Sequence, residues 1–268
     1  MMEHKEQVLL EKHEGVWLVT INQPQKMNAL DFDAHEALVS IWKDFVRDED
    51  ARVGVLTGAG PDAFSAGADL KTYTINFATR APHEFRQKYT EDVGLGGITR
   101  GLEINKPLIA AVNGYAISGG FELALACDVR LCSPNARFGL QDVKWGFHAC
   151  DGGLVRLPQI VGLGHAMDII LSGELIDAQH ALRIGLVNDI VPATQLVEVA
   201  LEKAKTWAQR APLAQQFAKQ TMRRLPNLPL QDALRAEVRS FYDLGQTEDL
   251  LEGTRAFREK RPAKFQGR

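Results

Sequence analysis

The 268-residue sequence has few cysteines, no long apolar run and no excess of positive charge. Cys127, Cys132 and Cys150 form no CxxC pair and lack metal-ligand spacing, so we expect packed thiols in a reducing compartment and no metal site. No stretch reaches the roughly eighteen consecutive apolar residues of a membrane-spanning helix. The N-terminus resembles neither a signal peptide nor a transit peptide. We therefore expect a cytoplasmic protein that does not enter a membrane.

The charge balance excludes another class of partner. With a formal net charge of −3 and a pI near 6.2, the chain has no overall positive field to attract nucleic acid or anionic lipid. Apolar residues make up 45% and charged residues 24% of the chain, which is ordinary globular composition. The length is sufficient to bury a substantial core.

The first part of the chain alternates short strands with glycine loops and helices. Residues 7–11 and 16–21 are typical of a hairpin, and Asp31 can cap the helix that follows. Strand patterns recur at 53–57, 107–112 and 129–132, with a helix predicted over 121–126. This alternation predicts parallel strands joined by crossover connections, and catalytic groups beyond the strand ends.

The pattern changes after Pro192, where amphipathic helical stretches cover 193–209, 212–224 and 230–258. We therefore divide the chain into a core, residues 1–192, and a helical C-terminal region, residues 193–268. Between the strand patterns, residues 72–101 are polar and rich in charge. Two interpretations of this segment are open: a helical excursion over the site, or a plain surface insertion.

Two glycine loops are candidates for binding a ligand: FSAGADLK at residues 64–71 and ISGGFE at residues 117–122. Each follows a strand and opens a helix, so each presents unpaired backbone N–H groups. Two such groups that point at one position would stabilise a developing oxyanion. Glycine at 67, 119 and 120 permits close approach of a ligand. The alternative is that these glycines serve backbone geometry alone.

Glu122 is a single carboxylate in an otherwise apolar helical run. The helix dipole and nearby N–H donors favour its charged form, so it could stay ionised near neutral pH and accept a proton. The alternative is an ordinary first-turn glutamate that stabilises the helix start. Its neighbours Phe121, Leu123 and Leu125 favour a buried position.

Five segments together resemble the crotonase superfamily of enoyl-CoA hydratases and isomerases: NQPQKMNAL, VLTGAGPDAFSAGADLK, KPLIAAVNGYAISGGFELALACD, ARFGLQDVKWG and EGTRAFREKRP. GGFELALA is especially similar to carnitinyl-CoA dehydratases. The resemblance implies an α/β fold, a crotonase-like spiral of ββα units, with a helical C-terminal region that forms trimers or hexamers. It also implies an acyl-CoA thioester substrate, with coenzyme A as part of that substrate and no separate cofactor.

By position, the resemblance places the two oxyanion donors on Ala68 and Gly119 and the carboxylates on Glu122 and Asp142. Family members commonly have glutamate at this last position, so the side chain here is one methylene shorter. His148 and Asp151 lie near positions where other members place alternative acid or base groups; a hydrogen-bonded structural histidine is the other interpretation of His148. The resemblance further implies that the CoA moiety contacts Ala66, Ala68, Asp69, Leu70, Lys71 and Gly119.

The favoured function is reversible addition of water to a 2-enoyl-CoA. Double-bond isomerisation with a single carboxylate is an alternative on the same fold. A serine hydrolase built on AFSAG, a near match to GxSxG, is a second alternative. A non-catalytic acyl-CoA-binding homologue, inactivated by aspartate at 142, is a third.

Overall fold

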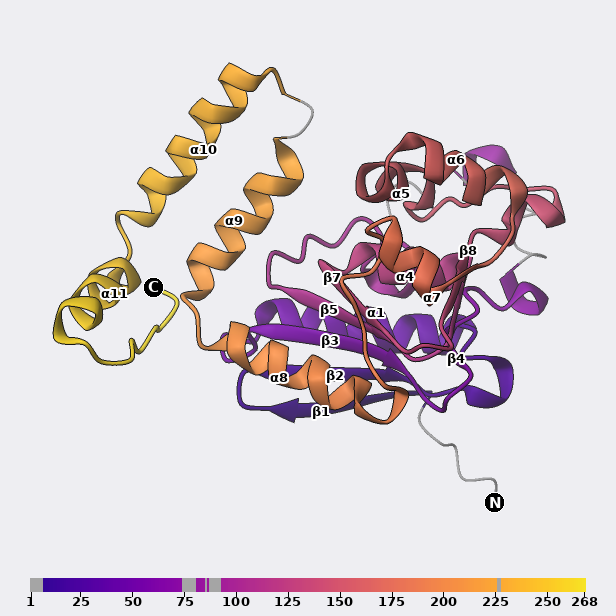
Figure 1. Ribbon diagram of the computed structural model, residues 1–268, viewed down its shortest axis with the longest axis horizontal. Coiled ribbons are helices and arrows are strands. Elements are labelled where there is room, and N and C mark those ends of the chain that lie inside the picture. The colour runs from indigo at the N-terminus through magenta and orange to yellow at the C-terminus, as the bar shows by residue number, and fades with distance from the viewer. Residues whose placement is uncertain (1–6, 74–80, 85, 87–92, 226–227) are drawn as a thin grey trace.

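The computed structural model describes residues 7–73, 81–84, 86, 93–225 and 228–268. These residues form a large sheet, a small sheet beside it and helices on both faces of the large sheet (Figure 1). The last helices extend away from this core. The expected α/β fold with a helical C-terminal region is confirmed. Most of the segment 72–101 lies outside the described residues.

The large sheet has six strands in the order β1-β2-β3-β5-β7-β10. The first two strands form the predicted antiparallel hairpin, and every later neighbouring pair is parallel. Parallel neighbours require the crossover connections that the alternation predicted. The strands are β1 (Val8–His13), β2 (Val16–Ile21), β3 (Val53–Gly58), β5 (Leu108–Val112), β7 (Val129–Cys132) and β10 (Asp189–Ile190).

Both faces of this sheet are buried, which explains why its strands are continuous apolar runs. On β5, Ala110 and Val112 belong to one apolar cluster, whereas Ile109 and Ala111 belong to another on the opposite face. Helices α1 (Phe32–Arg47) and α4 (Gly119–Ala126) contribute to the first cluster. Helix α8 (Leu196–Ala208) packs on the opposite face and contributes to the second cluster.

The small sheet has the order β4-β6-β8-β9. Its strand β4 follows β3, β6 follows β5 and β8 follows β7, so each of these turns adds one strand to each sheet. This repeat is the ββα spiral implied by the resemblance. The strands are β4 (Ala63–Ser65), β6 (Tyr115–Ile117), β8 (Arg137–Gly139) and β9 (Ile176–Asp177). Because β4 and β6 are parallel neighbours, the glycine loops that follow them begin side by side.

The predicted cap at the first helix is present, with the Asp31 side chain accepting a hydrogen bond from Ala34 N at 3.0 Å. No helix was expected over residues 153–183, where the chain forms three. These are α5 (Gly153–Val161), α6 (Leu163–Ser172) and α7 (Ala178–Arg183). Short 3₁₀ turns complete the core: η1 (Pro24–Lys26), η2 (Leu95–Gly97), η3 (Gln141–Trp145) and η4 (Ala193–Gln195).

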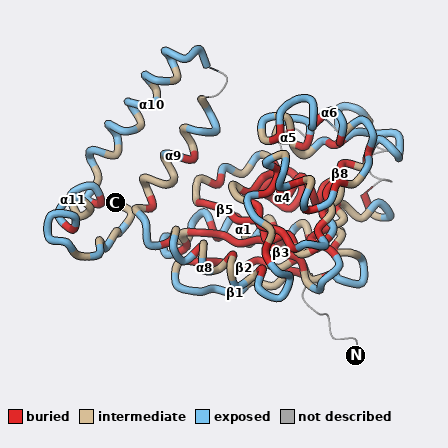
Figure 2. The backbone as a smooth tube through the Cα atoms, viewed as in Figure 1, coloured by how far each residue is buried: buried red, intermediate tan, exposed pale blue. Residues whose placement is uncertain are grey.

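The C-terminal region is helical as expected, but α8 packs on the sheet and only the later helices extend from the core. These are α9 (Pro212–Arg224), α10 (Leu230–Leu244) and α11 (Glu248–Glu259). The single stretch predicted over 230–258 is wrong, because Thr247 caps a new helix by accepting from Leu250 N. Figure 2 shows that α10 is largely exposed, and none of its residues is buried.

Side chains on α9 attach this region to the core. Lys219 is buried, lies 2.8 Å from the Asp128 carboxylate and donates to Lys106 O at 2.7 Å. Arg223 reaches the other oxygen of the same carboxylate, also at 2.8 Å. Within the described parts of the chain, no helix has both the length and the apolar character needed to cross a bilayer.

The cysteine prediction is confirmed for two of the three thiols. Cys127 and Cys132 are buried, and burial raises the pKa of each thiol to about 12. Cys150 is exposed, so the expectation of a packed thiol is wrong there. Its Sγ lies 3.8 Å from Asp151 Oδ2, beside the site described below.

Candidate active site

The two predicted glycine loops lie against each other. A Cβ atom added at Gly67 would lie only 2.8 Å from Gly119 N, and one at Gly119 would lie 3.4 Å from Ala68 N. At Gly120 an added Cβ would lie 1.9 Å from Ser65 O. At Gly67 and Gly120 the facing backbone leaves no room for a side chain, and at Gly119 a Cβ atom would be in tight contact with the facing loop. Glycine is therefore needed here for close backbone approach.

Each loop presents one backbone amide that is not used by the fold. Leu30 N donates to Gly67 O and Asp69 N donates to Leu30 O, so the bridge to Leu30 leaves the intervening Ala68 N–H free. Gly119 is the first residue of α4, where the N–H has no acceptor within the helix. Among the described residues neither amide donates a hydrogen bond. Both are available to a ligand oxygen.

Ser118 turns the chain from β6 into α4 in an uncommon backbone conformation, with φ 48° and ψ −120°. A non-glycine residue at positive φ carries strain, which surrounding structure must hold in place. Here Ser118 N donates to Gly139 O at 2.9 Å, and so joins the loop to β8. The turn places Gly119 N beside Gly67 of the facing loop.

The serine-hydrolase alternative fails on this geometry. Ser65 is fully buried, and its hydroxyl donates to Asn28 O at 2.8 Å while accepting from Gly67 N at 3.1 Å. The hydroxyl therefore fixes the first loop. A nucleophile would instead need a neighbouring general base within hydrogen-bond reach.

Glu122 is a buried residue, only 2% exposed, which rules out an ordinary surface glutamate. Its Oε1 accepts two hydrogen bonds, from Asp151 N and from Gly153 N, each 2.7 Å long. These donors come from the loop before α5 and from the first residue of α5, and not from the first turn of the helix that carries Glu122. They fix the carboxyl group in one orientation.

Burial opposes the ionised form that the sequence led us to expect for Glu122 near neutral pH. Burial raises the pKa of Glu122 to about 8, and the Asp151 charge adds to the increase. The N–H donors of Gly153 and Asp151 act in the opposite direction but are outweighed. The sequence showed the helix start but not the depth of burial, and desolvation is the larger effect.

Asp142 lies in η3, at 6% exposure, and its charge also raises the pKa of Glu122. Burial raises the pKa of Asp142 as well, while a bond from the Ser118 hydroxyl favours its charged form. Its Oδ2 is buried and has no hydrogen-bond partner among the described residues. Such an atom normally binds a polar group or a water molecule. The structure therefore brings together the two carboxyls that the sequence placed twenty residues apart.

The other two predicted groups lie in the loop that holds Glu122. Asp151 belongs to the site, because its backbone N–H binds Glu122 and its carboxylate accepts from Leu95 N and Thr99 Oγ1. His148 is exposed, with Nδ1 2.9 Å from Ala149 O, and its charge favours the ionised form of Asp142.

The residues expected at the CoA moiety form the outer part of the first loop. Ala66, Ala68 and Asp69 are half-buried, whereas Leu70 and Lys71 are exposed. The Asp69 side chain accepts from Lys71 N at 2.9 Å and lies 4.0 Å from Lys26 Nζ. Lys71 thus lies at the surface beside the loop, where its ammonium group can reach solvent.

Three neighbours of the site were not found from the sequence. Gly153 binds Glu122, and Leu95 covers Gly119 so closely that an added Cβ would lie 2.4 Å from Leu95 Cδ2. Arg156 donates to Asp151 O and Thr99 O. The paired Gly152 and Gly153 were a visible signal, but nothing local connected them with Glu122.

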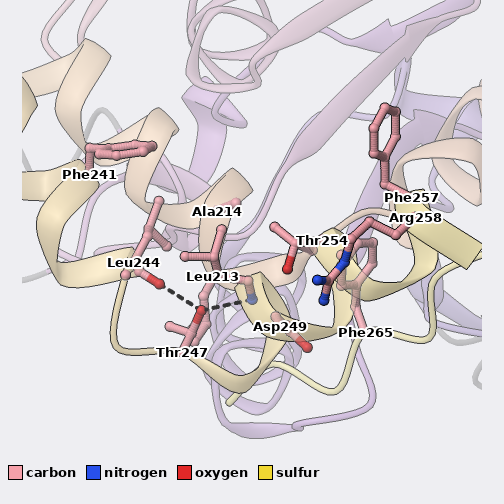
Figure 3. A pocket seen from close by; sticks show the side chains of 14 residues that line it. Leu213, Ala214, Phe241, Leu244, Thr247, Asp249, Thr254, Phe257, Arg258 and Phe265 are labelled. Carbon is pink, nitrogen blue, oxygen red and sulfur yellow. Dashed lines mark hydrogen bonds between the residues drawn. The ribbon is translucent and has the colours of Figure 1, made fainter.

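A separate apolar hollow of about 680 Å³ lies among α9, α10 and α11 (Figure 3). Its lining is mainly aliphatic and aromatic, including Leu213, Phe241 and Phe265. The Thr247 hydroxyl is engaged within the helix turn, where it donates to Leu244 O. None of the predicted site residues lines this hollow.

Comparison with known proteins agrees with this geometry. A family model described as enoyl-CoA hydratase/isomerase matches residues 11–268. The (E)-benzylidenesuccinyl-CoA hydratase of Thauera aromatica is 39% identical over 260 residues, covering 97% of this chain and 99% of that protein. The carnitinyl-CoA dehydratase of Salmonella typhi is 36% identical over 254 residues, covering 93% and 94% respectively.

Solved structures give the same result. A crystal structure of enoyl-CoA hydratase from Bacillus anthracis superimposes with a TM-score of 0.88 and 32% sequence identity, covering 98% of this chain and all of that one. The chain belongs to the enoyl-CoA hydratase/isomerase family. It is an enzyme of hydratase type, as the resemblance implied.

Proposed function

We propose that the chain catalyses the reversible addition of water to the double bond of a 2-enoyl-CoA thioester. The observation that carries this proposal is one arrangement: two free amides, Ala68 N–H and Gly119 N–H, on loops in contact, with the buried carboxyls of Glu122 and Asp142 nearby. The amides suit the thioester oxygen, and the carboxyls suit the water and its protons. Family membership supports the same substrate class.

The reaction needs one proton shared by the two carboxyls. The ionised carboxyl takes a proton from water as the oxygen bonds to the β-carbon, and the double-bond electrons move toward the thioester oxygen. The amides of Ala68 and Gly119 stabilise the resulting negative charge, an effect worth on the order of 3 kcal/mol per donor in other enzymes. The protonated carboxyl then gives its proton to the α-carbon. Atoms and charge balance without a cofactor beyond the CoA of the substrate.

Asp142 contributes the shorter of the two carboxyl side chains. Its unpartnered Oδ2 is suited to hold the attacking water, since a buried acceptor without a partner is unfavourable. The exposed edge of the first loop, from Ala66 to Lys71, would contact the CoA moiety. There the Lys71 ammonium would meet phosphate as a point charge.

The test is turnover of a panel of short, medium and aryl 2-enoyl-CoA thioesters, followed by product mass. Hydration adds the mass of one water, whereas isomerisation leaves the mass unchanged. We expect Glu122→Gln to lower kcat/KM by about 10²- to 10⁴-fold, the range of general acid–base catalysis. Binding of a saturated acyl-CoA should persist in this variant, because its shape is retained.

The side-chain length at position 142 separates the alternatives further. We expect Asp142→Asn to lose hydration and Asp142→Glu to stay within about a hundredfold of the wild type, the scale of a roughly 1 Å displacement. A strong gain in Asp142→Glu would indicate an enzyme adapted to isomerisation or another crotonase reaction. Tight binding of CoA esters with no turnover across the panel would indicate a non-catalytic homologue.

We also propose that the chain works as a homo-trimer, or as a hexamer of paired trimers, through its C-terminal helices. Support comes from α10, where Leu234, Val238, Phe241 and Tyr242 recur at helical spacing and are between 44% and 70% exposed. Phe257 on α11 is 85% exposed. Contiguous apolar surface of this kind is unusual on a monomer and typical of a subunit interface. Fatty-acid metabolism in the cytoplasm is the setting that fits such a reaction.

A further inference from the structure

Asp151 is the residue at which the two halves of the site meet. Its backbone N–H donates to Glu122 Oε1 at 2.7 Å. Its Oδ1 accepts from Leu95 N at 3.0 Å and from Thr99 Oγ1 at 2.9 Å. Arg100 Nε lies 3.3 Å from the same oxygen. One residue therefore contacts both the buried carboxyl and the segment 95–100.

That segment reaches the other half of the site through Leu95. The Leu95 side chain lies directly on Gly119, as the 2.4 Å distance from Cδ2 to an added Cβ shows. Gly119 N–H is one of the two proposed oxyanion donors. A displacement of Leu95 would therefore change the space around this donor, and the Asp151 carboxylate holds the Leu95 backbone.

Arg156 completes the arrangement from α5. Its guanidinium donates to Asp151 O at 3.1 Å and to Thr99 O at 2.6 Å, and so clamps the two segments together. Gly152 makes room for this clamp, because a Cβ atom there would lie 1.7 Å from Arg156 Nη1. A side chain at position 152 would therefore displace the Arg156 guanidinium from this place.

We propose that Asp151 is a positioning residue. Its backbone N–H fixes Glu122, and its carboxylate, through Leu95 and Thr99, fixes the surroundings of the oxyanion donor Gly119. The inference deepens the proposed function. Oδ1 already accepts two hydrogen bonds and lies in an ion pair with Arg100, and Oδ2 faces the Cys150 thiol at 3.8 Å. The carboxylate is therefore an anchor rather than a group that exchanges protons with the substrate.

The charged and titratable groups around Glu122 define what a change at Asp151 would do. Asp151 and Asp142 raise the pKa of Glu122, and Arg156 on α5 faces both Glu122 and Asp151. Arg100 and Cys150 face Asp151 from its two sides. Removing the Asp151 charge while keeping the shape of the side chain should lower the pKa of Glu122, because only burial and the Asp142 charge then oppose the two N–H donors.

The test compares Asp151→Asn with Asp151→Ala in the full-length protein. We expect Asp151→Asn to keep kcat within about tenfold of the wild type, since the amide oxygen can still accept from Leu95 and Thr99. Its pH profile should lose activity at a lower pH than the wild type. Asp151→Ala should lose kcat by about a hundredfold, with KM changed less, because misplacement of the reacting groups affects the transition state most.

A double variant separates positioning from a merely structural role. In a Glu122→Gln background, Asp151→Ala should reduce kcat by less than it does in the wild type, because the part of its effect that acts through Glu122 is already lost and only the part that acts through Gly119 remains. A full additional loss, or an Asp151→Asn variant as inactive as Glu122→Gln, would overturn the proposal. So would an unchanged pH profile in Asp151→Asn, or an Asp151→Ala variant with normal kcat.

Exchange of the α-proton of a saturated acyl-CoA in D₂O provides a readout independent of hydration. This exchange needs the proposed oxyanion donors and a carboxyl but no added water. If no enoyl-CoA is hydrated and exchange still falls in Asp151→Ala with rescue in Asp151→Asn, the proposed function fails and the positioning role stands. Exchange that is equal in all three proteins overturns the positioning role.

Discussion

At the scale of single residues, Glu122 shows how burial can bring the pKa of a carboxyl close to neutral pH. Its helix start and its two N–H donors favour the charged form, but burial and the Asp151 charge dominate and raise the pKa to about 8. Burial also raises the pKa of Asp142. Two nearby carboxyls that resist ionisation share a proton over a broad pH range. The mechanism proposed above for hydration uses this shared proton.

The first prediction concerns the pH dependence of the reaction. We expect kcat/KM to follow a bell-shaped curve and to decline above about pH 8, because both carboxyls are then ionised and none can protonate the α-carbon. Hydration and dehydration should share this profile, since the net reaction neither takes up nor releases protons. Initial rates in both directions from pH 5 to 10 would check it. Constant kcat/KM through pH 8 would contradict the assignment.

The second prediction concerns stability. With a raised pKa, native Glu122 keeps its proton at pH values where the unfolded chain has released it. The native state therefore loses stability as pH rises from the usual glutamate range to about 8, by an amount on the order of a few kcal/mol. Glu122→Gln cannot ionise, so its unfolding free energy should exceed that of the wild type increasingly with pH.

Denaturant unfolding of both proteins at pH 5, 7 and 9 would measure this difference. Glu174→Gln is a suitable control, since this glutamate is exposed and pairs with Lys144 at the surface. A difference between wild type and Glu122→Gln that shrinks as pH rises would mean that Glu122 is stabilised in its charged form.

At the scale of elements, the site depends on loops that follow neighbouring parallel strands. β4 and β6 are paired, so the loops after them must leave the small sheet side by side. Glycine then allows the loops to touch, and the first turn of α4 supplies one of the free amides. The strained Ser118 is the residue at which this turn is made.

The third prediction compares two glycines. Gly120→Ala should destabilise the protein by about 1–3 kcal/mol or more and abolish turnover, because its Cβ would meet Ser65 O at 1.9 Å. Gly164→Ala, in α6, should be neutral or stabilising by up to about 1 kcal/mol, because no atom lies within 4 Å of its added Cβ. Denaturant midpoints and hydration rates would measure both. Equal effects would contradict the close approach of the loops.

At the scale of the whole molecule, the core is closed on both faces of its sheet whereas α10 has no buried residue. Lys219 and Arg223 fix α9 to the core through Asp128. The apolar residues of α10 remain exposed to solvent beside this attachment. A stripe of this kind needs a partner surface to be removed from water.

The fourth prediction follows from that stripe. The wild type should have the mass of three or six chains in light scattering after size exclusion, and Val238→Glu with Phe241→Glu should yield a smaller species. Arg239→Glu, one residue from Val238 but outside the stripe, should leave the mass unchanged. A wild type that is monomeric at micromolar concentration would contradict the trimer.

The elements were largely predictable because local signals define them. Alternating strands, the Asp31 cap and the glycine loops lie where short-range patterns placed them. The break between α10 and α11 was also readable, since Thr247 is followed by an acidic first turn. The helices over 153–183 were missed, because α5 and α6 each begin after a glycine without a capping side chain, and Pro158 lies inside α5.

The sequence by itself determined the α/β alternation, the two loops and the residue types available to the site, because helix caps, turns and strand patterns depend on neighbours along the chain. Only the tertiary structure decided that the loops touch, that Asp151 and Gly153 hold Glu122, and that one Asp142 oxygen has no hydrogen-bond partner in the described part of the chain. The physical reason is that desolvation and contact between distant segments set both the positions and the pKa values of these groups. Neither quantity is encoded within a short window of residues.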